Sequence, residues 1–250
     1  MTTASRPRRA PARGRLAEGV TRDLEERIAT GELAPGCLLP PEAQLARDYG
    51  VSSRVVREAL GALAARGLVA VLAGKGTVVR GVDAAALRDF FLVAMRSDSH
   101  GLWDLFELRK LVEVQVAALA ARRATAAGIA RCEAAFQRLE AAQGSPETYV
   151  VADIDFHQSV AEATGNRMLA LVLEGLREPL RVGRTLSWQG RLRVGDEIAD
   201  QIEMHRRILQ AVRRHQPRAA GDAMARHLDL AELHLRAALP VTFGEDGYNR

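Results

Sequence analysis

The sequence predicts a mainly α-helical protein in which a small N-terminal domain with one β-hairpin precedes an all-helical bundle. In residues 39–79, two short helical patterns are followed by two apolar, β-branched runs. From Asp83 onward, apolar residues recur at helical spacing without strand-like alternation. The length of 250 residues and the hydrophobic fraction of 48% suit two domains. We therefore expect an arm (residues 1–14), a small domain (15–82), a bundle (83–239) and a C-terminal tail (240–250).

The arm contains four arginines among Ala, Pro, Thr and Ser, and no acidic residue: Arg6, Arg8, Arg9 and Arg13. Such a segment cannot form a core and is predicted to be disordered. It either reaches DNA phosphates or a minor groove, or it is only a solubilising tail. After the arm, apolar residues repeat every four positions and predict a first helix that ends at Gly31: Leu16, Val20, Leu24 and Ile28.

Residues 41–66 carry the start and stop signals of a helix-turn-helix. The first helix begins at Pro41 and stops at Gly50, and Ser52 or Ser53 caps a second helix that reaches about Arg66. The core face of the second helix is apolar: Val56, Ala59, Leu60 and Leu63. Its opposite face is small and basic: Ser53, Arg54, Arg57 and Gly61. A recognition helix has this pattern, because it packs on one face and offers guanidinium groups to a DNA groove on the other.

The next two runs, residues 68–73 and 77–80, predict a hairpin with a basic tip at Gly74 and Lys75, the wing of a winged helix-turn-helix. Residues 1–82 contain 13 Lys and Arg against 8 Asp and Glu, whereas residues 83–250 contain 22 against 23. Charged faces are common in any protein, but here the basic excess coincides with the helix-turn-helix pattern. Double-stranded DNA is therefore the predicted partner of the first third of the chain.

Seven helical patterns with short links follow and predict an antiparallel bundle. The patterns are Leu87, Phe90, Phe91 and Met95; Leu105, Leu108, Leu111, Val112 and Leu119; Ile129, Phe136 and Leu139; Tyr149, Val150, Phe156 and Val160; residues 168–186; Ile198, Ile202, Leu209 and Val212; and Ala220, Met224, Leu228 and Leu235. Pro179 lies inside the fifth helix and is expected to kink it.

One acidic residue and three histidines are predicted to face the interior of the bundle. Asp153 and His157 are four residues apart on one helix, so both side chains point to the same side. His205 continues the stripe of Ile198 and Ile202, and His227 continues that of its own helix. Any one of these histidines is readily explained as a hydrogen-bonded core residue. Four such groups together instead favour a shared divalent metal ion, since unpaired titratable groups in a core cost several kcal/mol.

The N-terminal third resembles the DNA-binding head of the GntR family of bacterial transcription regulators. The similarity rests on the motifs G-x-L-x-P-G, L-P-x-E-x-x-L-A, G-V-S, V-R-E-A-L and G-L-V and on a G-x-G wing. It implies that Arg57 contacts the operator and that Gly74 and Lys75 approach the minor groove. Ser53 stands where many members have an arginine, with Arg54 one residue later, and Ala43 stands where many have a basic residue, so the operator sequence stays open.

Residues 85–238 are similar to the FCD ligand-binding domain that follows this head in the FadR subfamily. The matching segments are D-I-D-F-H, E-M-H-R-R-I-L-Q-A-V and M-A-R-H-L. The resemblance implies a divalent metal, zinc first with manganese or nickel as alternatives, which binds the carboxylate of an effector. The implied ligands are Asp153, His157, His205 and His227. Three other histidines and one aspartate match no motif and are interpreted as surface or packing residues, with His234 the most plausible substitute ligand: His100, His215, His234 and Asp155.

Arg109 is in line with Leu105 and Val112 on the long helix. A guanidinium group in an apolar stripe needs an anion, and its planar fork suits a carboxylate. The resemblance implies that this anion is the effector. The alternative is an internal salt bridge to Glu113 or Asp153.

Together these observations predict a regulator, a repressor in most members of the family, whose operator binding responds to a small hydroxy-, keto- or sugar acid. A homodimer formed through the bundles is expected to read a palindromic operator. The competing class is a metal-dependent hydrolase or lyase built on the Asp/His cluster, but no carboxylate is spaced as its general base. A third class, an architectural DNA protein, leaves the interior histidines unexplained. Because no apolar run is long enough to span a membrane and the two cysteines have no zinc spacing, a cytoplasmic protein is expected.

Overall fold

The computed structural model describes residues 13–81, 83–97 and 100–239. The chain divides into two compact units between Ala86 and Leu87, four residues beyond the boundary that the sequence suggested. Most of the predicted basic arm and the tail at 240–250 lie outside the described residues, but Arg13 and Gly14 already belong to the first helix, so the arm is shorter than expected. Among the described residues, no helix combines the length and apolarity needed to cross a membrane.

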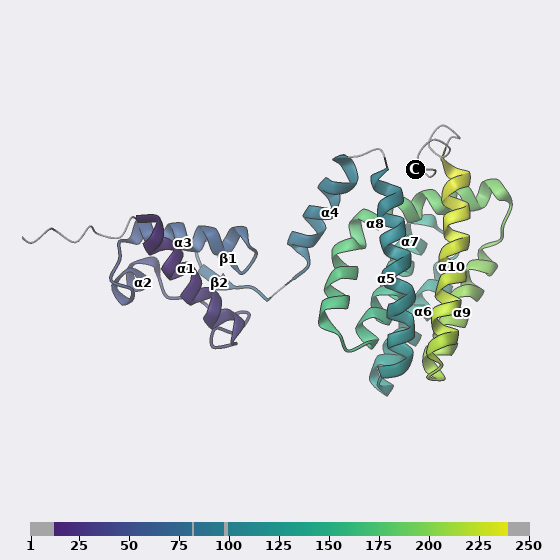
Figure 1. Cartoon of the computed structure of the whole chain (residues 1–250), viewed down its shortest axis with the longest axis horizontal. Coiled ribbons are helices and arrows are strands. Elements are labelled where there is room, and N and C mark those ends of the chain that lie inside the picture. Colours follow the sequence, from purple (N-terminus) through teal and green to yellow (C-terminus); the bar gives the residue numbers. More distant parts are fainter. Residues whose placement is uncertain (1–12, 82, 98–99, 240–250) are drawn as a thin grey trace, which may run out of the picture. The chain divides into compact units, whose positions relative to one another are not determined.

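The first unit is a winged helix-turn-helix (Figure 1). Its elements are α1 (Arg13–Ala29), α2 (Glu42–Asp48), α3 (Ser53–Ala65), β1 (Val69–Leu72) and β2 (Gly76–Val79). The strands pair antiparallel, with Val69 opposite Val79 and Leu72 opposite Gly76. Ser52 caps α3 by accepting a hydrogen bond from the Val55 backbone N–H at 3.4 Å. The predicted apolar face of α3 is buried against α1 and the hairpin.

The described residues of the second unit form seven helices, the number predicted (Figure 1). They are α4 (Ala85–Ser97), α5 (Gly101–Arg123), α6 (Ala126–Ala141), α7 (Pro146–Ala163), α8 (Arg167–Val194), α9 (Ile198–Arg213) and α10 (Pro217–Ala238). Helix α10 packs against α8, α5 and α9, and α7 packs against α6, α8 and α5. Most of the apolar core lies between α5, α6, α7, α9 and α10. The long α5–α10 helices thus surround one interior.

Helix α8 is longer than the sequence indicated. It runs through Pro179 to Val194, eight residues beyond the expected end at Leu186, and stops at Gly195, whose φ of 79° is a left-handed helix end. At Gly190, α8 approaches α10 so closely that an added methyl group would collide with the backbone carbonyl of His234. This approach fixes α8 against α10 along the part of the helix that the sequence pattern had missed.

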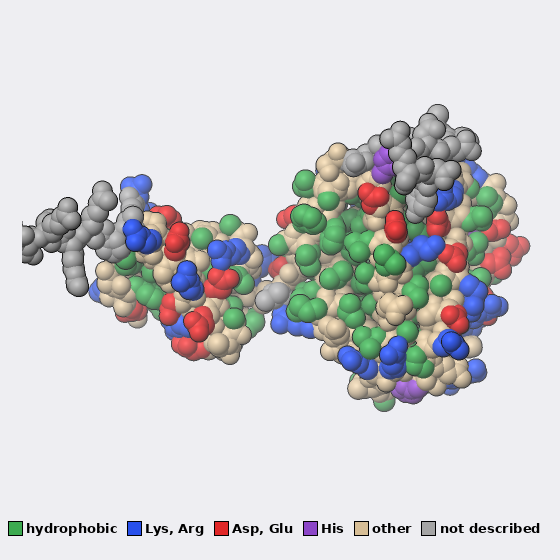
Figure 2. Space-filling view, viewed as in Figure 1, with side chains coloured by type: hydrophobic (Ala, Val, Ile, Leu, Met, Phe, Trp, Pro, Cys, Tyr) green, Lys and Arg blue, Asp and Glu red, His purple; other side chains and the backbone are tan. Residues whose placement is uncertain are grey.

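Some apolar residues that marked helices face outward. Leu111 is 68% exposed and Phe90 is 66% exposed, contrary to their expected core positions. Leu111 lies midway between the buried Arg109 and Glu113, so at 100° per residue it points to the opposite side of α5. Figure 2 shows hydrophobic side chains gathered over the part of the bundle that carries α4 and α5, where Phe90 and Val93 are exposed.

Candidate functional site

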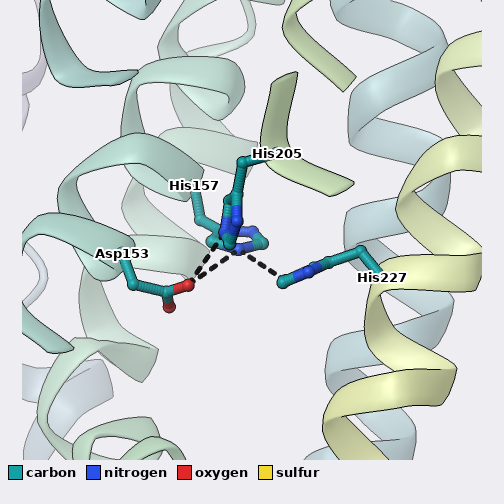
Figure 3. A group of neighbouring side chains, drawn as sticks. All are labelled: Asp153, His157, His205 and His227. Carbon is teal, nitrogen blue, oxygen red and sulfur yellow. Dashed lines mark hydrogen bonds and ion pairs between the residues drawn. The ribbon is translucent and has the colours of Figure 1, made fainter. Parts of the chain in front are cut away.

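Four side chains from three helices converge in the interior of the bundle (Figure 3). Asp153 and His157 come from α7, His205 from α9 and His227 from α10, and all four are buried. One ligand atom from each lies within 4.8 Å of every other. The structure therefore brings together the four residues that the sequence singled out.

The ring nitrogens and the carboxylate face a common point. His205 Nε2 is 2.9 Å from Asp153 Oδ1, and His157 Nε2 is 3.7 Å from the same oxygen. The Nε2 atoms of His157 and His227 are 3.2 Å apart. Ligand atoms that each lie about 2.1 Å from one shared metal ion are separated from one another by similar distances.

Contacts outside the cluster orient the imidazole lone pairs inward. His205 Nδ1 is 2.7 Å from the carbonyl oxygen of Gln201, which can only accept, so the proton of the neutral ring lies on Nδ1. His157 Nδ1 lies against the carboxylate of Glu113, and its Nε2 is 3.4 Å from Nη2 of Arg109, a donor. His205 Nε2 and Asp153 Oδ1 are then two acceptors at short distance, an arrangement that a shared cation stabilises. The donor set thus fits a divalent metal ion.

Electrostatics keep these groups in their ligand forms. Burial lowers the pKa of His157, although Glu113 and Asp153 oppose the shift. Burial, reinforced by the neighbouring imidazoles, holds the pKa of His227 well below its ordinary value. For Asp153, burial acts to raise the pKa, but Arg184 and His157 lower it well below its ordinary value. At neutral pH, His157 and His227 are therefore neutral imidazoles and Asp153 is an ionised carboxylate, the forms that metal binding requires.

Two buried arginines adjoin the cluster. Arg109 donates from Nε to Glu113 Oε1 at 2.7 Å, which is one of the two internal salt bridges considered for it. Arg184 on α8 donates from Nε to Asp153 Oδ2, and its Nη2 is 3.9 Å from Glu113. Arg184 was not predicted as a site residue. Its sequence signal is that it extends the buried row of Leu176 and Leu180 by one further four-residue step.

A cavity opens beside these residues. Arg109, Asp153, Arg184 and His227 line one part of it. Both polar and apolar residues line the rest: Tyr149, Ser187, Arg191, Gln201 and His234, with Phe106, Val150, Gly183, Trp188, Ile198 and Ala231. His234 is buried outside the Asp/His cluster, where its Nε2 is 2.7 Å from Asp196 and its Nδ1 is 3.3 Å from Gln201. His215 and Asp155 also lie outside the cluster, in contacts with Ala121 and Arg177.

The predicted DNA-contact residues are all exposed on the first unit. They are Ser53, Arg54 and Arg57 on α3, and Gly74 and Lys75 in the turn between β1 and β2. Arg57 also bonds to Glu42 at the start of α2, with Nη2 2.8 Å from Oε2. The guanidinium group, 70% exposed, is thus oriented while its outer edge stays available.

Comparison with known proteins agrees with both units. Residues 16–79 match the family described as "Bacterial regulatory proteins, gntR family", and residues 104–230 match the FCD domain. The HTH-type transcriptional regulator LutR of Bacillus subtilis is 32% identical over 82% of this chain and 94% of its own length. The Uxu operon transcriptional regulator of Escherichia coli is 32% identical over 78% of this chain and 77% of its own length.

A third relative is the HTH-type transcriptional repressor NanR of Escherichia coli, 30% identical over 87% of this chain and 83% of its own length. Among solved structures, a Streptococcus agalactiae GntR protein superposes with a TM-score of 0.66 at 29% identity, covering 85% of this chain and 97% of that one. These relatives are transcription regulators and not enzymes, which removes the hydrolase or lyase alternative. The chain belongs to the GntR family and is a transcription regulator with a helix-turn-helix DNA-binding domain and an FCD effector domain, the arrangement of a FadR-type regulator.

Proposed function

We propose that this protein is a homodimeric repressor whose operator binding is controlled by a small organic acid bound at a divalent metal in the FCD domain. The observation that carries the proposal is the buried cluster of Asp153, His157, His205 and His227 with two arginines beside it. The relative NanR, which is named as a repressor, supports repression over activation.

The four cluster residues would hold the metal. Three imidazoles and one carboxylate suit zinc, and they also suit manganese or nickel when further positions are filled by other oxygen ligands. The bound ion supplies a Lewis acid that attracts a carboxylate or an adjacent hydroxyl group. Glu113 and the Gln201 carbonyl keep the His157 and His205 rings in the orientation that the ion needs.

Arg109 and Arg184 are the groups that would receive the negative charge of the effector. Both are buried and both line the cavity next to Asp153. A guanidinium fork binds a carboxylate through two parallel hydrogen bonds, which orients the acid as well as attracting it. Arg109 leaves part of its present contact with Glu113 to make these bonds, so effector binding is coupled to a rearrangement on α5.

On the DNA side, Arg54 and Arg57 would read bases in the major groove, while Gly74 and Lys75 approach the minor groove. Two such heads on a two-fold dimer require a palindromic site. The exposed apolar residues Phe90 and Val93 on α4 are candidates for the dimer contact, since single soluble domains rarely expose such clusters without a partner. An effector that favours one arrangement of the dimer then changes operator affinity.

The proposal is tested with purified protein and the DNA upstream of its own gene. Mass spectrometry should find about one divalent metal per chain, and a footprint should reveal a palindrome. A screen of organic acids by fluorescence anisotropy should identify an acid that releases the DNA only from metal-loaded protein. An acid that acts equally well on chelator-treated protein would contradict the metal-dependent mechanism.

A further inference from the structure

A second layer of buried polar side chains lies beside the metal cluster. None of these side chains belongs to the four residues of that cluster. The layer consists of Tyr149, Arg191, Gln201 and His234, all of which line the same cavity. Each is less than a tenth exposed: 6% for Tyr149, 7% for Arg191, 7% for Gln201 and 1% for His234. We call these four residues the distal layer.

The distal layer is displaced toward one end of the bundle on all four helices that supply it. Tyr149 and Gln201 lie four residues before Asp153 and His205, whereas Arg191 and His234 lie seven residues after Arg184 and His227. Helices α7 and α8 run antiparallel, as the Asp153–Arg184 and Tyr149–Trp188 contacts require. Helices α9 and α10 are also antiparallel, as the His205–His227 and Gln201–His234 contacts require. At 1.5 Å per residue, the distal layer lies roughly 6 to 10 Å from the metal cluster along the bundle.

Two donors in the distal layer have no partner among the described residues: the hydroxyl group of Tyr149 and Nε of Arg191. The Arg191 guanidinium is held over the Trp188 ring, 4.6 Å from its centroid, and donates from Nη1 to the Asp196 carbonyl at 2.6 Å. Burial, with Asp153 next in effect, raises the pKa of Tyr149 well above its ordinary value, so the phenol keeps its proton. Unsatisfied buried donors are strongly unfavourable, so this pair is matched to an acceptor that enters the cavity.

The charges in and around the cavity favour an acceptor that is an anion. Arg109 and Arg184 are balanced by Glu113 and Asp153, whereas Arg191 donates to the backbone carbonyl of Asp196. The carboxylate of Asp196 is 36% exposed and pairs with His234 instead. A divalent metal adds two positive charges to this set. A monocarboxylate neutralises only one of them, whereas a dicarboxylate neutralises both, and uncompensated buried charge is strongly unfavourable.

We propose that the effector is a dicarboxylate whose first carboxylate lies on the metal and Arg109 and whose second lies between Arg191 and Tyr149. This inference rests on the proposed function, because it takes the metal-bound carboxylate as given. The lower end of this offset, about 6 Å at Tyr149, corresponds to a diacid of about five or six carbons, and the longer Arg191 side chain can span the rest. Arg191 and Tyr149 are then the residues that distinguish a diacid from a monoacid of the same length.

The test uses calorimetry on metal-loaded full-length protein with pairs of acids of equal length: glutarate with valerate, and adipate with hexanoate. At least one diacid should bind about tenfold or more tightly than its monoacid, since a buried charge-assisted pair contributes more than 1.4 kcal/mol. Arg191→Met should reduce diacid affinity to the monoacid level and leave monoacid affinity unchanged. Tyr149→Phe, which retains the ring, should weaken the diacid by a smaller factor.

Arg193→Met is the matched control. Arg193 lies on the same helix as Arg191, but it is exposed, is not among the residues that line the cavity and donates to the backbone carbonyls of Ala237 and Ala238. This substitution should leave both affinities unchanged. Equal binding of the two members of each pair, or diacid binding that Arg191→Met and Tyr149→Phe do not alter, would overturn the diacid inference but not the metal-bound carboxylate. Equal or tighter binding of gluconate, a monoacid with neutral hydroxyls at its far end, would also overturn it. If no acid binds metal-loaded protein, the proposed function fails and this inference fails with it.

Discussion

Arg109 donates from Nε to Glu113 Oε1 at 2.7 Å, and both side chains are at most 3% exposed. The arginine that the sequence suggested for the effector is therefore already paired with an internal carboxylate. Because Glu113 also lies against His157, one carboxylate connects the arginine proposed to bind the effector to a histidine proposed to bind the metal. Effector and metal are thus expected to affect each other's affinity to the same extent.

Substitutions in the Arg109–Glu113 pair should distinguish an effect on the free energy of unfolding from an effect on carboxylate binding. Arg109→Met leaves the Glu113 carboxylate with less compensation and should reduce the free energy of unfolding by about 3–5 kcal/mol. The double variant Arg109→Met, Glu113→Gln removes the uncompensated charge and should recover most of that loss in urea titrations. Both variants should lose carboxylate binding in calorimetry. Retained binding in the stable double variant would remove Arg109 from the effector site.

Metal removal should destabilise the protein. Metal at a hundredfold excess over its dissociation constant stabilises the folded state by about 2.7 kcal/mol. For a domain of this size, that corresponds to a fall in Tm of roughly 5–10 °C on chelation. His205→Ala should abolish the difference between metal-loaded and chelated samples in a thermal melt.

His215→Asn is the control for that experiment. His215 is outside the cluster and adopts a positive φ of 53°, a conformation that asparagine tolerates. The variant should keep the full difference in Tm on chelation. If His215→Asn also abolishes the change in Tm on chelation, that change does not result from metal binding at the cluster.

Arg57 and Lys75 of the head should contribute differently to DNA binding, Arg57 by contacting bases and Lys75 by contacting phosphates. Arg57→Ala is expected to reduce operator affinity by about 1–3 kcal/mol and to relax the preference for one base position. Lys75→Ala should weaken binding to all sequences alike and lower the slope of log affinity against log salt by about one. Anisotropy titrations over a range of salt concentrations measure both. Arg66→Ala, which breaks a contact with Glu25 at the end of α3, is the comparison and should change neither selectivity nor slope.

The close approach of α8 and α10 at Gly190 should be intolerant of a side chain. A methyl group there would collide with the backbone of His234, which cannot rotate away, so Gly190→Ala is expected to cost about 3 kcal/mol in urea unfolding. At Gly183 the added carbon would meet only the end of the Leu102 side chain at 3.3 Å. Gly183→Ala should therefore change stability by less than about 1 kcal/mol. Equal effects of the two substitutions would contradict the packing described for α8.

Much of the fold was predictable because helical periodicity reports burial directly. The apolar face of α3 was identified correctly because its residues pack on one side only. Leu111 was placed wrongly because α5 buries Arg109 and Glu113, so hydrophobicity does not mark its inner face. Helix α8 was shortened because the arginines after Leu186 resemble a helix end, whereas the structure buries Arg191.

The convergence of Asp153, His157, His205 and His227 could be anticipated because these residues lie on the same faces as apolar neighbours and match recognisable motifs. Arg184 and the distal layer could not, since their roles depend on which residues of different helices meet. Spacing along α8 alone does not reveal that Arg191 stacks on Trp188, or that Tyr149 of α7 contacts the same ring. Such contacts follow from helix packing, which no local pattern encodes.

The distal layer lies one to two helical turns from the Asp/His cluster, and neither Arg191 nor Tyr149 is one of the four residues of that cluster. A substitution at Arg191 or Tyr149 is expected to alter which acid is preferred while all four residues of the cluster are retained. New ligand selectivity is therefore accessible by single steps that preserve the metal, the fold and the DNA-binding head. The same spacing offers a practical route to a biosensor, in which the distal residues are varied while the response to metal-bound carboxylate is retained.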